Sequence, residues 1–94
     1  MNRKPPIFRI VIECSGLPSE AGAQGADDIT RRFAMRPWHA NALCNWDGAR
    51  LILTAENDFD PQGLALMDEF SDEISACISE AFDGDLRLVS AIRL

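Results

Sequence analysis

The chain is poor in the residues that most often build metal centres and active sites. Its 94 residues include one histidine, His39, no tyrosine, and three cysteines, Cys14, Cys44 and Cys77. The cysteines are odd in number and widely spaced, and they match no zinc or redox motif. We therefore expect free thiols. Cys44 and Cys77 fall on apolar faces and are expected to pack as small apolar side chains, whereas the role of Cys14, at the end of a strand where a loop begins, stays open. We expect no metal, no cofactor and no catalytic group of residues.

Long apolar runs and an excess of positive charge are also missing. No uninterrupted apolar segment is long enough to span a bilayer. The basic start of the chain leads into residues 7–13, which Arg9 interrupts and which lack the cleavage site of a secretory signal. A formal net charge of −6 disfavours binding to nucleic acid or to an anionic membrane through bulk electrostatics. We expect one soluble, acidic, cytoplasmic domain over residues 1–94.

The hydrophobic pattern changes period along the chain and predicts six elements. Alternation of apolar and polar residues predicts strands at residues 7–13, 38–46, 49–57 and 86–94. Helical spacing predicts a first helix over residues 19–35, with Gly22 and Gly25 as small residues for close packing. A second helix is predicted from an N-cap at Asp60, with Pro61 in its first turn, to Phe82 or Asp83 before Gly84.

The resulting order is strand, helix, strand, strand, helix, strand. This is the split βαβ order of the ferredoxin-like fold, an α+β two-layer sandwich in which a four-stranded antiparallel sheet of order 4-1-3-2 carries both helices on one face. The fold hosts many unrelated functions, so a site must define the function. RNA-recognition domains of this fold stack bases on aromatic side chains of the two central strands. Those positions here hold Arg9, Val11, Ile52 and Thr54, which provide no stacking surface.

Asp47-Gly48 lies between two alternating runs and predicts a two-residue type I′ turn. That turn would pair Trp46 with Ala49 and would place one apolar face toward the helices. It would also pair His39 with Glu56 on the opposite, uncovered face. A carboxylate beside the imidazole favours its charged form, which fits a surface ion pair and, as the less common alternative, a general base or a pH switch. The acids of the second helix are expected to form a solvated surface.

The uncovered sheet face predicts two kinds of function. The first is a non-enzymatic association module that forms a homodimer through this face or through the edge of the last strand. Its expected interface residues are Val11, Leu43, Ile52 and Val89. The second is a sensor or an enzyme that binds a small anionic ligand at basic side chains of the same face. Its expected ligand-binding residues are Arg9, His39, Arg50, Glu56, Arg87 and Arg93. The pattern favours the first.

Overall fold

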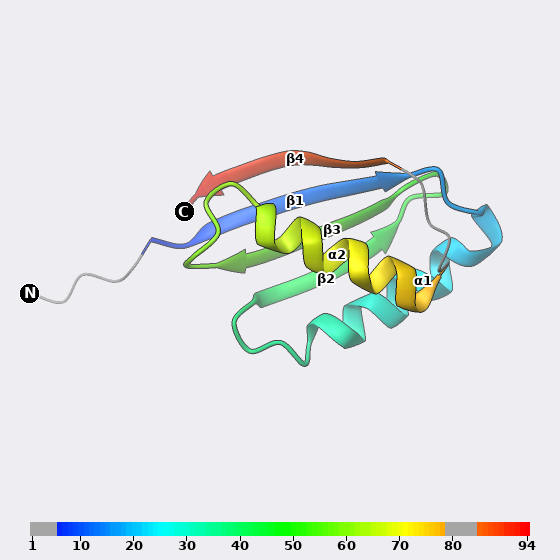
Figure 1. Cartoon of the computed structure of the whole chain (residues 1–94), viewed down its shortest axis with the longest axis horizontal. Coiled ribbons are helices and arrows are strands. Elements are labelled where there is room, and N and C mark those ends of the chain that lie inside the picture. The colour runs from blue at the N-terminus through cyan, green and yellow to red at the C-terminus, as the bar shows by residue number, and fades with distance from the viewer. Residues whose placement is uncertain (1–5, 79–84) are drawn as a thin grey trace, which may run out of the picture.

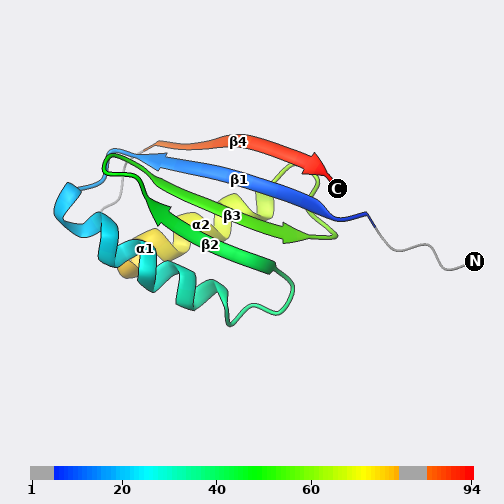
Figure 2. The same cartoon turned by 180° about the vertical axis from the view of Figure 1, so that it is seen from behind.

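The computed structural model of the protein describes residues 6–78 and 85–94 and contains the six expected elements. They are β1 (Phe8–Ser15), α1 (Ser19–Phe33), β2 (Ala40–Trp46), β3 (Leu51–Asn57), α2 (Leu64–Cys77) and β4 (Asp85–Arg93). The strands form one antiparallel sheet in the order β2-β3-β1-β4, which is the predicted order. Both helices lie on one side of the sheet (Figure 1), and the view from behind shows the strands in front of α2 (Figure 2). The ferredoxin-like fold is confirmed.

The core lies between the sheet and the two helices. Alternation along β1 and β3 sends every second side chain toward the helices, because successive residues of a strand point to opposite faces. The fully buried side chains on the sheet side are Ile10, Ile12, Cys14, Leu51, Leu53 and Ala55. They pack against Ala26, Ile29 and Phe33 of α1 and against Leu66, Phe70 and Ile74 of α2. Each large side chain buried in this way contributes about 1.5–3 kcal/mol relative to its exposed state.

Close packing of α1 depends on its two glycines, as expected. A Cβ atom on Gly22 would lie 2.1 Å from the Trp46 ring, and one on Gly25 would lie 2.5 Å from the Ile78 side chain. Neither distance is compatible with van der Waals contact, so α1 approaches the hairpin and the end of α2 only because both residues lack a side chain.

The hairpin between β2 and β3 differs from the predicted one. Trp46 pairs with Leu51 instead of Ala49, and the loop contains the four residues 47–50. One carboxylate oxygen of Asp47 accepts the backbone N–H groups of Ala49 and Arg50. Gly48 has a positive φ of 99°, whereas Asp47 does not have the positive φ of a type I′ turn. The type I′ prediction is therefore wrong because the Asp47 side chain closes a longer turn. A shift of two residues keeps each side chain on its predicted face.

A β-bulge at the start of β2 changes which side of the sheet the preceding side chains lie on. The regular pairing of Leu43 with Thr54 is followed by Ala40 with Glu56, and Asn41 lies between them with a φ of +54°. One extra residue in a strand turns the side chains beyond it to the other face. His39 is therefore buried on the helix side, and its predicted pairing with Glu56 on the open face is wrong.

A second bulge lies in β4. Ile12 pairs with Leu88 and Val11 pairs with Ser90, which leaves Val89 as the extra residue. Beyond this bulge, too, the side chains of β4 lie on the opposite side of the sheet from the predicted one, because Ile92 pairs with Arg9. Ile92 thus belongs to the open face, and the predicted placement of Arg93 on that face is wrong.

The start of α2 is also later than predicted. The helix begins at Leu64, because Gly63 precedes it with a left-handed φ of 72°. The N-cap is Gly63, so the predicted N-cap at Asp60 and the predicted place of Pro61 in the first turn are wrong. The Asp60 carboxylate nevertheless serves the first turn from outside the helix, since it accepts the backbone N–H groups of Ala65 at 3.2 Å and Leu66 at 2.9 Å. The predicted end of this helix near Phe82 lies outside the residues that the structure describes.

Truncation of Leu53 tests the assignment of the core face. Leu53 is fully buried, so Leu53→Ala should lower the free energy of unfolding by about 2–5 kcal/mol through loss of burial and formation of a cavity. Urea unfolding followed by circular dichroism measures this loss. Ile52→Ala is the matched control on the other face of the same strand, where the side chain is only partly buried. Equal losses for the two variants would contradict the assignment.

Candidate functional site

The open face, defined as the sheet surface opposite the helices, is built from rows that cross all four strands. Its middle row consists of Leu43, Thr54, Val11 and Ser90, which follow one another through the strand pairing. Leu43 is 48% exposed, and none of the four side chains is charged. One flanking row contains Asn45, Ile52, Glu13 and Arg87, and the other contains Ala40, Glu56, Arg9 and Ile92.

The charged residues of the flanking rows are paired within the face. Arg9 Nε lies 2.9 Å from Glu56 Oε2 on the neighbouring strand. At the other end of the face, Glu13 accepts a hydrogen bond from Arg50 at 3.2 Å and forms a second ion pair with Arg87. Arg50 also lies 3.6 Å from Asp47 in the hairpin loop. Each of these three arginines, all expected to bind an anion, therefore already has a carboxylate partner.

A hollow of about 350 Å³ lies at the Glu13 end of the open face. Arg50 and Arg87 line it, but so do Glu13 and Asp85. An anion entering here would meet two carboxylates and would compete with Glu13 for both guanidinium groups. The arrangement therefore disfavours the anionic ligand predicted from the sequence.

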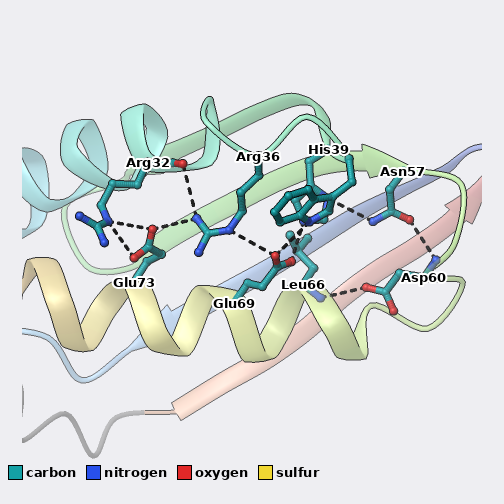
Figure 3. A network of polar contacts seen from close by, with 9 residues as sticks. Arg32, Arg36, His39, Asn57, Asp60, Leu66, Glu69 and Glu73 are labelled. Carbon is teal, nitrogen blue, oxygen red and sulfur yellow. Dashed lines mark hydrogen bonds and ion pairs between the residues drawn. The ribbon is translucent and has the colours of Figure 1, made fainter.

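His39 belongs to a different cluster, between the sheet and α2 (Figure 3). Its Nε2 lies 2.6 Å from Glu69 Oε2, and its Nδ1 lies 3.3 Å from Asn57 Nδ2. The amide oxygen of Asn57 accepts the backbone N–H groups of Phe59 and Asp60, which turns its NH₂ group toward the ring. Nδ1 of His39 is then the acceptor and Nε2 carries the proton. Both nitrogens are occupied and the side chain is fully buried, so His39 has no atom available for proton transfer or metal binding.

Two glutamates of α2 connect this cluster to α1. Glu69 lies 3.2 Å from Arg36 Nε. Glu73 is 3% exposed and receives hydrogen bonds from Arg32 at 2.8 and 2.9 Å and from Arg36 at 2.8 Å. Burial alone would raise the pKa of Glu73, but the hydrogen bonds from Arg36 and Arg32 hold it below its ordinary value. The prediction that the acids of α2 form a solvated surface is wrong for Glu73.

Sequence reasoning overlooked this network although a signal was present. Arg32 and Arg36 are four residues apart on one segment, and Glu69 and Glu73 have the same spacing on another. Side chains at i and i+4 share a helix face. Glu69 and Glu73 both lie on α2, and Arg32 lies on α1 with Arg36 in the loop directly after it. Two such pairs of opposite charge, on segments that the fold packs against one sheet face, indicate ion pairs between them.

Cys44 and Cys77 pack as predicted, and Cys14, whose role the sequence left open, is buried as well. Cys14 and Cys44 are buried, Cys77 is partly buried, and all three are free thiols. Burial raises the pKa of Cys14 to about 11, with a smaller contribution from Asp85, and burial raises the pKa of Cys44 to about 12. Burial also raises the pKa of Cys77. Thiols with such pKa values stay protonated at neutral pH and are poor nucleophiles.

Comparison of the chain with protein-family models, with curated proteins and with solved structures finds no match. In residues 6–78 and 85–94, no three His, Cys, Asp or Glu side chains are placed to hold a metal ion together. The helices within the same residues include none that is long and apolar enough to cross a membrane. The arrangement of the side chains is therefore the basis for any functional inference.

Removal of the Glu73 charge tests the network between the helices. Glu73→Gln should lower the free energy of unfolding at neutral pH by about 1.5–3 kcal/mol, the range for a lost hydrogen bond to a charged partner. The folded-state pKa of Glu73 lies below its ordinary value, so its contribution is complete above the ordinary glutamate pKa and is lost as the pH falls through the lower, folded-state value.

Urea unfolding of wild type and Glu73→Gln from about pH 6 to about pH 3 measures this pH dependence. The difference between the two proteins should shrink as the pH falls. Asp72→Asn is the matched control, because Asp72 is the exposed neighbour on the same helix. A difference that stays constant with pH would contradict the role given to the Glu73 charge.

Proposed function

We propose that the protein is a non-enzymatic association module that forms a homodimer through its open sheet face. The observation that carries this proposal is the uncharged middle row, which lies between two sets of ion pairs that are complete within the face. In such a surface the uncharged row can be buried at little cost, and the ion pairs beside it lower the desolvation cost that unpaired charges would carry.

The partner is a second copy of the chain. Because the open face balances its own charges, it offers no strong field that would select an acidic or a basic partner. An identical face is equally balanced and equally uncharged along its middle row, and a two-fold axis lets the same patch of both chains meet, so that each contact occurs twice. Leu43 and Ile92, which are 48% and 55% exposed, lie at opposite edges of the sheet and widen the apolar surface toward both edges.

The free edge of β4 is a less suitable interface. Its bulge at Val89 breaks the alternation of side chains, so the two halves of the strand cannot both match a regular partner strand. Bulges of this kind are a common protection of edge strands against pairing with other chains. We therefore assign the dimer to the face and not to the edge.

Sedimentation velocity of wild type and two variants tests the proposal. Wild type should sediment with the mass of two chains at high micromolar concentration. Leu43→Glu places a carboxylate in the middle row and should shift the protein to one chain, because a buried charge without a partner strongly opposes association. Met35→Glu is the control, since Met35 is 75% exposed and follows α1 on the helix side of the molecule.

The outcomes separate the possibilities. Wild type that remains a single chain at high micromolar concentration rules out the homodimer. A dimer that Leu43→Glu leaves intact places the interface elsewhere, and Val89→Glu then examines the β4 edge. Circular dichroism of each variant is the folding control, and all of them should be folded because the substituted positions are exposed.

A further inference from the structure

A small hollow lies at the end of the sheet opposite the hairpin between β2 and β3. Its volume is about 240 Å³, and the residues that line it come from the segment before β1, the loop before β2 and the end of β3. The lining residues are Ile7, Pro37, Trp38, Ala40, Glu56, Asn57 and Asp58. They include an aromatic ring and two carboxylates, and no lysine or arginine is present among the lining residues that the structure describes.

The ring of Trp38 is held in place but remains half exposed. Its Nε1 donates a hydrogen bond to Glu69 Oε1 at 3.0 Å, and Trp38 as a whole is 50% exposed. The polar atom is therefore satisfied inside the protein, and the exposed part of the side chain is the apolar ring surface. The face of an indole ring attracts cations through its π electrons, more strongly than any other aromatic side chain.

The carboxylates of the hollow differ in how they are used. Glu56 is engaged within the protein, because Asn41 donates to it at 3.0 Å and Arg9 at 2.9 Å, and these bonds lower its pKa. Asp58 is exposed at the rim. The loop that carries it is held by Asn57, whose Oδ1 accepts the N–H groups of the two residues that follow Asp58. Asp58 thus places a negative charge next to a fixed aromatic ring.

The dimensions of the hollow limit what it can bind. Sites for small molecules commonly have volumes of about 300–1,000 Å³, so this hollow fits a group the size of one amino-acid side chain. Its remaining walls include Ile7, Pro37 and Ala40, which suit the methylene stem of a long basic side chain.

We propose that this hollow binds an arginine side chain presented by a partner polypeptide. The guanidinium plane stacks on the Trp38 ring and pairs with the Asp58 carboxylate, while the stem contacts the apolar wall. Arginine fits better than lysine because its planar, weakly hydrated group stacks on aromatic rings and forms paired hydrogen bonds with a carboxylate. The pinned Trp38 and the ordered Asp58 loop reduce the entropy that binding would otherwise cost. This site lies outside the middle row of the open face.

Nuclear magnetic resonance of the full chain tests the proposal directly. The chain has two tryptophans, so its ¹H–¹⁵N spectrum contains two indole N–H signals. Titration with N-acetyl-arginine amide at constant ionic strength should shift the Trp38 signal in a saturable manner, with a dissociation constant on the order of 1 mM for so small a ligand. Trp46, which packs over Gly22, is the internal reference and should not move. N-acetyl-citrulline amide, which has nearly the same shape without the charge, should bind at least about tenfold more weakly.

A pair of charge-matched variants completes the design. Asp58→Asn should weaken binding of the arginine derivative by about five- to tenfold, the effect of one lost charge contact at a partly exposed site. Asp72→Asn changes the net charge equally but lies on α2, outside the hollow, and should bind as wild type does. Equal binding of citrulline and arginine, equal weakening in both variants, or an unchanged Trp38 signal would each overturn the proposal.

Discussion

Glu69 and Glu73 lie one helical turn apart on α2, and together they contact Arg32 from α1 and both Arg36 and His39 from the loop after it. A carboxylate as buried as Glu73 costs several kcal/mol unless cations and hydrogen bonds compensate for its lost hydration. A displacement of α2 by one turn would move Glu69 and Glu73 away from their present partners and break the contact between Glu73 and Arg32. The ion pairs therefore add a directional constraint to the packing of the apolar stripes, which the hydrophobic effect alone does not supply.

The same contacts extend into a closed circuit of hydrogen bonds. It joins the residue before β2, the end of β3 and the start of α2. Glu69 binds His39, His39 binds Asn57, and Asn57 orders the turn that ends at Asp60. The Asp60 carboxylate then binds the first turn of α2, the helix that carries Glu69. Because each bond in such a circuit holds the donor or acceptor of the next, their contributions support one another. The side-chain hydrogen bonds of this circuit hold the loops on either side of the small hollow, whereas loops at the surface commonly have fewer such bonds.

Hydrophobic alternation was sufficient to predict the elements, their order and the buried face of β1 and β3, because each of those strands has a regular pattern with one clear apolar side. The prediction of which face a side chain occupies is wrong beyond the two β-bulges, where one extra residue is inserted in β2 and in β4. Both sides of β4 carry apolar residues, and Ser90 and Ala91 fit either face, so the position of the bulge at Val89 leaves no mark in the sequence. Asn41 gave a weak signal, since asparagine tolerates a positive φ better than most residues. The hairpin loop was mispredicted because Asp47 can bond through its side chain, which the preference of Asp-Gly for a type I′ turn does not take into account.

The bulge in β4 also supports the proposed association function over the anion-binding alternative that the sequence left open. Without the bulge, Arg93 would belong to the open face and Ile92 would point toward the helices. The rows of the face would then carry a further cation beyond the paired Arg9 and Arg87, and an additional positive charge favours an anion-binding surface. With the bulge, Ile92 stands opposite Arg9 on the open face and is 55% exposed. One inserted residue therefore exchanges a positive charge for an apolar side chain. The electrostatic balance of the face, and with it the argument for association, depends on this local irregularity more than on the fold.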